Sequence, residues 1–290
     1  MRKPRVALFL GILCISLFPV LIRLQLSSGL FAAFYRMAIA ALFLLPYAII
    51  KKKFRFSSPQ MWLPVVGCGI LFACDIAVWN ISIQESSATQ ATLLTNLSPV
   101  WVGIISFLFL TNKPRRSFWI GSVIAMTGIV VFMGLSTFKG LSFDRAFIFG
   151  LLSGLFYAMY ILLSKKVLET EEVISFVTVS TVSSTLFLLL VNLFFNQQFI
   201  GYDTSAWLTF WVQGIVCQLM AWLLISYATQ RMRATRVSLA LLSQVVFAGL
   251  LAWLWIGEAV TLQKIAGGVL ILLGIAATFY EPATKKIENN

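Results

Sequence analysis

One acidic residue in this sequence is expected to lie deep inside a long apolar segment. Asp75 falls within the stretch 61–83, whereas the other nine acidic residues lie near the ends of such stretches or between them. A charged carboxylate in hydrocarbon is costly, so it normally faces a cavity, finds a partner or becomes neutral. Asp75 is therefore a candidate for binding a substrate ammonium group or a coupled proton. The alternative is a packing role, with the carboxyl group bonded to a neighbouring helix or paired with Arg36.

A tryptophan lies at helical spacing from this acid. Trp79 follows Asp75 by four residues, which places both side chains on one helix face, and Asn80 lies about 100° further round. A tryptophan beside a carboxylate suits an amine-bearing or aromatic substrate, through cation–π contact or stacking. The alternative is ordinary packing, since the chain holds nine tryptophans. We predict that Trp79 contacts substrate and that Asn80 has a gating or structural role.

A polar face is also expected in the apolar stretch 146–164. Spacings of four, three and four residues align Ser153, Tyr157, Tyr160 and Ser164. Such a stripe on a membrane helix lines either a cavity or a contact between helices, where its hydrogen bonds contribute little free energy. We favour the cavity and predict that both tyrosines contact substrate.

Neutral polar side chains occur in three further apolar stretches. They are the amides Asn96 in 87–110, Gln218 in 206–226 and Gln244 in 237–256, and the first of these stretches also contains Pro99. Amides both donate and accept hydrogen bonds, which suits a polar metabolite better than a bare ion. We therefore assign the three amides to substrate binding. Pro99 can free a backbone carbonyl by interrupting a helix, which indicates a gating or structural role.

Several kinds of enzyme chemistry have no support in this sequence. The chain contains no histidine, which removes histidine-based catalytic triads, metal sites and proton relays. Its four cysteines lie in apolar stretches without CxxC spacing, as expected for small buried side chains. The nucleophile-elbow, zinc-protease and Walker A motifs are absent as well. We predict no metal, no cofactor and no enzymatic activity.

The composition indicates which elements must position these side chains. Of 290 residues, 60% are hydrophobic and 11% are charged, against about a quarter charged in soluble domains. The apolar residues form blocks of about 20, the length of a helix that crosses a bilayer. The first block has a basic start like a secretory signal, but it is long and no cleavage site follows. The predicted spans are 6–24, 30–50, 61–83, 87–110, 117–135, 146–164, 173–195, 206–226, 237–256 and 260–280.

The net charge of +12 follows the predicted topology. Seventeen of the 22 basic residues fall in segments on the side of the N-terminus, and four fall on the other side. This bias places both termini in the cytoplasm. We therefore expect a multi-pass protein of a bacterial inner membrane, with the bilayer as a partner and no binding of nucleic acid.

An internal repeat relates the two halves of the chain. Residues 88–133 align without gaps with residues 234–279, at a constant spacing of 146 residues and with ten identities in 46 positions. The identities include three glycine pairs, and small residues mark close helix packing in membranes. Because each unit holds five spans, the second copy must be upside down. Inverted repeats that meet near the midplane are typical of secondary carriers, although a duplicated bundle could also be inert or enzymatic.

Several motifs together resemble the EamA-type carriers of the drug/metabolite transporter superfamily. They are FACDIAVWN at 72–80, SATQATLLTNLSP at 87–99, FYRM at 34–37, WIGE at 255–258, and the residues Gln263, Gly267 and Gly274. Arg36 stands where this family commonly has an arginine in the second span. One departure is visible, since Thr111 and Asn112 replace a common Gly-Glu pair. These two residues lie in the connection between the predicted spans 87–110 and 117–135, and the departure puts in doubt a role for a carboxylate in that connection.

The resemblance implies an all-α membrane fold of ten helices in two inverted five-helix EamA repeats, with boundaries at 5–135 and 146–280. It also implies a cavity between the repeats and transport of amino acids or other small metabolites, frequently as export. Arg36 and Glu258 are assigned gating or structural roles.

The leading hypothesis is a secondary active exporter of amino acids or related amphipathic amines, working by alternating access around a midplane cavity. A coupled proton is one option at Asp75. The alternatives are a non-transporting scaffold, a lipid translocator or an intramembrane enzyme, the last of which lacks a set of catalytic residues. The sequence assigns neither the substrate's identity nor the oligomeric state.

Overall fold

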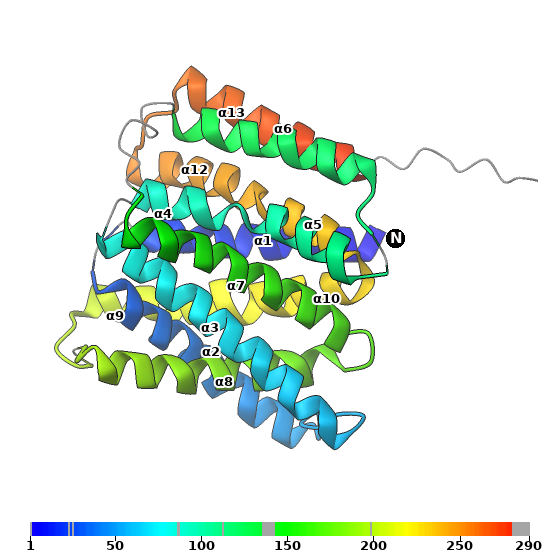
Figure 1. The fold of residues 1–290 in the computed structure, drawn as a ribbon. Coiled ribbons are helices and arrows are strands. Elements are labelled where there is room, and N and C mark those ends of the chain that lie inside the picture. Colours follow the sequence, from blue (N-terminus) through cyan, green and yellow to red (C-terminus); the bar gives the residue numbers. More distant parts are fainter. Residues whose placement is uncertain are drawn as a thin grey trace, which may run out of the picture.

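The computed structural model contains ten helical spans that are long and apolar enough to cross a membrane. It describes residues 2–22, 24, 26–85, 88–111, 113–134, 143–197 and 199–279. The elements are α1 (Arg2–Ile22), α2 (Gly29–Ile50), η1 (Pro59–Met61), α3 (Trp62–Glu85), α4 (Ala88–Thr95), α5 (Ser98–Phe109), α6 (Arg116–Met133), α7 (Arg145–Val167), α8 (Val173–Phe194), α9 (Thr204–Val212), the π-helical η3 (Gln213–Met220), α10 (Ala221–Arg231), α11 (Ala234–Leu241), α12 (Ser243–Ile256) and α13 (Leu262–Phe279). The prediction of ten spans is confirmed, and Figure 1 shows them running side by side as one bundle.

The outer surface of this bundle is apolar. Large side chains such as Leu63, Val123, Leu190 and Leu254 are at least 64% exposed. A water-soluble domain does not expose apolar surface of this extent, whereas lipid covers it at no cost. The chain is therefore a multi-pass membrane protein.

The fourth and ninth spans are both interrupted near the middle. In the fourth span, α4 ends at Thr95 and α5 begins at Ser98, with Pro99 in its first turn. The ninth span changes from α11 to α12 at Leu242, although it has no proline there. The break before Pro99 agrees with the expectation from the sequence, and the repeat spacing of 146 residues carries that break from Asn96 to Leu242.

The fifth and tenth spans, α6 and α13, pack against each other through the glycines that the repeat had paired. A Cβ on Gly121 would lie 2.4 Å from the carbonyl oxygen of Gly274, and one on Gly128 would lie 2.8 Å from that of Gly267. Residue numbers rise along one helix as they fall along the other, so the two helices are antiparallel. Gly121 and Gly267 are repeat mates, as are Gly128 and Gly274, so the interface has an approximate two-fold axis.

The other helix contacts follow the same symmetry. The third span packs on the sixth (α3 on α7), and its repeat mate packs likewise (α10 on α1). The fourth span contacts the sixth, and the ninth contacts the first; α2 and α8 pack on each other. The fold is therefore two inverted five-helix repeats. Residues 135 and 280, which end the predicted repeats, lie outside the described residues.

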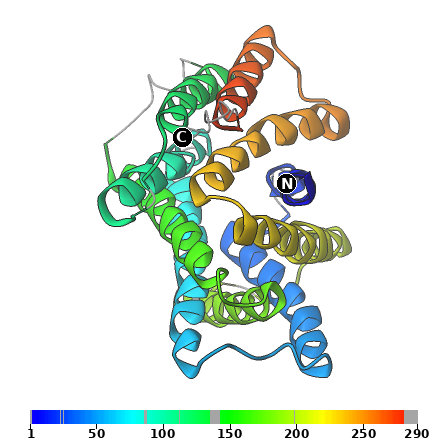
Figure 2. The same cartoon turned by 90° about the vertical axis from the view of Figure 1, so that its right-hand side faces the viewer.

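The first residues of α1 and the last of α13 lie at one end of the bundle, which faces the viewer in Figure 2. We call it the basic end; it carries the start of α1, the end of α13 and the basic connection between α2 and η1. Arg145 and Lys264 are the described basic side chains at the opposite end. Arg36 lies between the two ends.

Candidate functional site

The carboxylate of Asp75 is buried between the two repeats. Its side chain projects from α3 and is 7% exposed. The hydroxyl of Ser153, on α7, donates a hydrogen bond of 2.6 Å to its Oδ1. The Ser153 oxygen also lies 2.7 Å from Oγ1 of Thr95, at the end of α4. Because the Ser153 proton is directed to Asp75, Thr95 donates to Ser153, and this chain of hydrogen bonds joins the third, fourth and sixth spans.

Small residues on α7 fit against the break in the fourth span and so place Ser153. A Cβ on Gly154 would lie 3.0 Å from the carbonyl oxygen of Leu94 and 3.2 Å from that of Thr95. Pro99 has no N–H to donate to the Thr95 carbonyl, so that oxygen is left without its helical partner. Glycine at 154 lets α7 approach these oxygens, and the adjacent Ser153 then reaches Asp75.

The second buried charge at the site is the guanidinium of Arg36 on α2. Arg36 is 3% exposed, and its Cζ lies 4.2 Å from the ring centroid of Phe18 on α1. It attracts Asp75 electrostatically, but the two side chains form no ion pair in the described part of the chain. Its Nε has no hydrogen-bond partner. Of the two packing partners expected for Asp75, the neighbouring helix is therefore present and the arginine pair is not.

An aromatic cluster lies beside Asp75, one turn along α3. The ring of Phe72 is 4.8 Å from that of Tyr160 and 4.6 Å from that of Trp222, between centroids. Tyr157 packs at the edge of this group, 6.4 Å from Trp222. Both predicted tyrosines thus lie beside Asp75, on the same side of α7 as Ser153. Trp222 was missed by the sequence analysis, although it follows Gln218 by one helical turn.

Trp79 lies on the other side of the acid, toward the first span. Its ring centroid is 6.3 Å from that of Phe18, the residue that stacks under Arg36. Trp79 and Arg36 thus both pack against one phenylalanine. The structure brings the predicted tryptophan and arginine into a single neighbourhood.

The eighth span contributes an irregular segment. Gln213 and Gln218 are each 2% exposed within η3, and the Oε1 atom of each has no hydrogen-bond partner among the described residues. A Cβ on Gly214 would lie 3.3 Å from the carbonyl oxygen of Arg36, so η3 approaches α2 at this arginine. Single π-helical turns often mark functional sites. The sequence singled out Gln218 but did not predict the π-helix.

Other predicted residues have local partners. Asn80 donates to the carbonyl of Ile76, and Asn96 donates to that of Thr92, both at 2.8 Å within their own helices. Gln244 is half-buried at the start of α12. Their predicted roles stay predictions.

Glu258 lies in a tight turn at the opposite end of the bundle. It pairs with Lys264 at 2.8 Å and follows Gly257, whose φ of 69° ends α12 in the left-handed region. A glycine reaches that region without strain, so the turn accounts for the Gly-Glu pair of the motif. This position lies far from Asp75 along the bundle.

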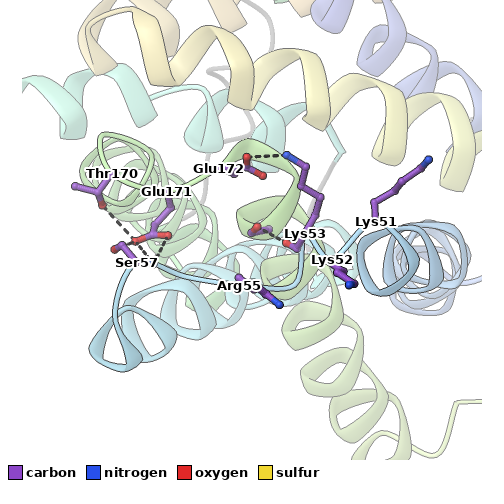
Figure 3. A pocket seen from close by; sticks show the side chains of 9 residues that line it. Lys51, Lys52, Lys53, Arg55, Ser57, Thr170, Glu171 and Glu172 are labelled. Atoms are coloured by element: carbon purple, nitrogen blue, oxygen red, sulfur yellow. Dashed lines mark hydrogen bonds and ion pairs between the residues drawn. The ribbon is translucent and has the colours of Figure 1, made fainter.

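A hollow of about 490 Å³ lies elsewhere, at the basic end, where the connection from α2 to η1 meets that from α7 to α8 (Figure 3). Glu171 accepts hydrogen bonds from the backbone N–H of Ser57, at 3.0 and 3.2 Å, and from its hydroxyl. Glu172 pairs with Lys53 at 2.7 Å. These contacts join the two repeats at the membrane surface. No three Cys, Asp or Glu side chains of the described residues lie close enough to share a metal ion.

Comparison with known proteins agrees with this architecture. The model of the EamA-like transporter family matches residues 4–134 and 144–280. The chain belongs to the EamA-like transporter family. A solved crystal structure superposes with a TM-score of 0.79 over 94% of this chain and 95% of that one, at 15% identity, which supports the fold.

Relatives of this EamA-family chain are named as transporters. Uncharacterized transporter YdfC of Bacillus subtilis is 25% identical over 85% of this chain and 80% of its own length. Pseudopaline exporter CntI of Pseudomonas aeruginosa is 26% identical over 84% of each chain. An S-adenosylmethionine uptake transporter of Rickettsia bellii is 21% identical over 52% of this chain and 50% of its own. The family and these names assign the chain to small-molecule transport.

Proposed function

We propose that this protein is a secondary active exporter of amino acids or related amphipathic amines. Its repeats, 5–135 and 146–280, would move by alternating access around a site centred on Asp75. The observation that carries the proposal is the hydrogen bond from Ser153 to Asp75. It joins a span of the first repeat to a span of the second, so movement of one repeat against the other must lengthen or break it.

The surroundings of Asp75 support a cationic, partly apolar substrate. A buried carboxylate with one described hydrogen-bond donor retains acceptor capacity for an ammonium group. The rings of Tyr157, Tyr160 and Trp79 offer stacking and cation–π surface within the same region. Gln218 and Asn96 add amides for further polar groups, with Gln244 at the start of α12. A proton could replace the substrate on Asp75, which would couple export to proton entry.

Export is favoured over uptake by the comparison with named relatives. The exporter matches over 84% of both chains, whereas the uptake transporter matches over about half of each. We also propose that the basic end faces the cytoplasm of a bacterial inner membrane, because loops rich in Lys and Arg stay inside. A non-transporting scaffold is less consistent with a polar, ionisable interior.

Transport by the purified full-length protein in liposomes tests the proposal. Radiolabelled amino acids and amines would be screened for counterflow, with and without a pH gradient. We expect saturable flux that Asp75→Asn reduces by at least tenfold, together with loss of any stimulation by the pH gradient. The loss reflects a charged contact that an amide replaces poorly.

Asp203→Asn is the matched control. Asp203 caps α9 by accepting a hydrogen bond from the backbone N–H of Ala206 at 2.8 Å, and asparagine caps helices equally well. Its flux should equal that of the wild type. Normal flux in Asp75→Asn would leave a transporter whose site lies elsewhere, and absence of flux for every compound would contradict the proposed substrate class.

A further inference from the structure

The guanidinium of Arg36 is a buried positive charge that makes no direct contact with an anion among the described residues. The side chain is 3% exposed, and its Nε–H has no acceptor. A buried donor without an acceptor is costly, and a charged one is more so. Such a group is expected to gain an acceptor in some state of the transport cycle.

The contact with Phe18 determines which part of Arg36 remains available. The Cζ atom lies 4.2 Å from the ring centroid, so the guanidinium makes a cation–π contact with the face of the ring. The N–H groups of a guanidinium point outward within its own plane and can bind a planar anion through two parallel hydrogen bonds. Phe18 therefore supports Arg36 while leaving this edge without a partner.

Phe18, which lies under the Arg36 guanidinium, also packs against Trp79, one helical turn from Asp75 on α3, yet Arg36 and Asp75 form no ion pair in the described part of the chain. Tyr157 comes from the other repeat, and its ring lies 6.5 Å from that of Phe72, one turn before Asp75 on α3, between centroids. One small molecule that carries both signs of charge could therefore contact both side chains. An amine would satisfy Asp75 alone and leave Arg36 without an acceptor.

We propose that Arg36 binds an anionic group of the substrate while Asp75 binds its ammonium group, so that the transported class is zwitterionic. The inference rests on the proposed function and narrows its substrate class. It also gives Arg36 a binding role in place of the gating or structural role expected from the sequence.

Neighbouring groups indicate the rest of such a substrate. The cluster of Phe72, Tyr160 and Trp222 provides an apolar, aromatic wall beside Asp75. Within the described part of the chain, the indole Nε1 of Trp222 is a buried donor without a partner, and the Oε1 atom of Gln218 is a buried acceptor without one. An amphipathic zwitterion with an aromatic or large apolar side chain matches this set of groups.

Three probes of similar size distinguish binding of the ammonium group from binding of the anionic group. L-Phenylalanine carries both groups, phenethylamine carries only the ammonium group, and 3-phenylpropionate carries only the carboxylate. Thermal unfolding of the purified full-length protein in detergent would be recorded at rising concentrations of each. We expect L-phenylalanine to stabilise the wild type at concentrations at least tenfold lower than phenethylamine. In Arg36→Gln the two should act at equal concentrations, whereas Arg36→Lys, which keeps the positive charge, should retain part of the preference.

The control is Arg145→Gln at the opposite end, where the arginine pairs with Glu85 on the surface; its preference should match the wild type. An unchanged preference in folded Arg36→Gln would overturn the role of Arg36. If phenethylamine equals or exceeds L-phenylalanine in the wild type, the zwitterion inference fails while the proposed amine transport stands. A response to none of the three probes contradicts both. If Arg36→Gln does not fold, Arg36→Lys and the wild-type comparison still decide the matter.

Discussion

Two helix pairs, α3–α7 and α1–α10, are equivalent in the inverted repeat, and among their described residues Asp75 of α3 is the one acidic residue away from a helix end. The spacing of 146 residues links Glu85, at the end of α3, to Arg231, at the end of α10. The same spacing sets Ala221 in the place of Asp75 and Gly11 in the place of Tyr157. Where α1 meets α10, a Cβ on Gly11 would lie 3.0 Å from the Ala221 carbonyl oxygen, so the backbones are in close contact.

This difference shows that the helix packing of the fold does not depend on the carboxylate of Asp75. The α1–α10 pair forms with an alanine and a glycine, so this packing geometry does not need a carboxylate. Asp75 exists in one repeat alone, and it is held there by Ser153 and Thr95. The glycines between α6 and α13, by contrast, occur in both repeats and maintain the symmetric interface.

The largest effect is expected where symmetry is retained. Gly267→Ala would place a Cβ 2.4 Å from the backbone nitrogen of Phe132, and backbone atoms cannot move aside as a flexible side chain can. We expect the free energy of unfolding to fall by about 3 kcal/mol, the upper part of the range for overpacked sites. Thermal unfolding in detergent measures this loss.

The adjacent glycine is the matched control. A Cβ on Gly268 meets Val246 at 3.5 Å, an ordinary contact, so Gly268→Ala should leave stability close to that of the wild type. The repeat mate of Gly267 is Gly121, and Gly121→Ala should cost about as much as Gly267→Ala. Equal stability of Gly267→Ala and Gly268→Ala would show that the close approach of α6 and α13 is wrong.

A smaller effect is expected where symmetry is broken. Ser153→Ala removes the donor to Asp75 and leaves Thr95 without its partner, and we expect about a tenfold loss of transport, or about 1.4 kcal/mol. Ser164→Ala is the control on the same helix, because its hydroxyl bonds only to the carbonyl of Ile161 at 2.9 Å. Counterflow in liposomes measures both variants. Similar flux in the two would contradict a role for the Ser153 hydrogen bond.

The spans, their number and the inverted repeat were predictable because each rests on local signals. Apolar length gave the ten helices, and the paired glycines indicated close helix packing, although the structure was needed to show that α6 and α13 are the partners. Pro99 indicated the break in the fourth span, since proline removes a backbone donor. The break at Leu242 has no such residue. The repeat points to it instead, because the spacing of 146 residues links Leu242 to Asn96 in the break of the fourth span.

The site was predictable in its residue types and not in its arrangement. Asp75 and Trp79 stood out because polar and ionisable groups are rare inside spans. That Ser153 reaches Asp75 depends on Gly154 fitting against the broken fourth span, a contact between helices far apart in the sequence. Phe18 and Trp222 are apolar residues among many others, so their place beside the charges becomes visible only in three dimensions.

The connections between helices show the same contrast at the two ends of the bundle. At the basic end, Glu171 binds Ser57 and Glu172 binds Lys53, so ionised groups join the repeats (Figure 3). At the opposite end, the described hydrogen bond between the repeat-equivalent connections is a neutral one, in which Ser28 donates to Gln197 at 2.7 Å. Equivalent connections of the two repeats can therefore be joined either by ionised side chains or by a neutral hydrogen bond.

Of the two glutamates at the basic end, the more buried one should contribute more to the free energy of unfolding. Glu171 is 4% exposed and accepts two bonds from one backbone N–H, so Glu171→Gln should lower the free energy of unfolding by about 1 kcal/mol. The Glu172 side chain is 57% exposed, so Glu172→Gln should cost a few tenths of a kcal/mol, and added salt should abolish even that. Thermal unfolding at low and high salt distinguishes them. If both losses disappear in salt, Glu171 acts only through its charge at the surface, and the buried hydrogen bonds to Ser57 contribute nothing to joining the repeats.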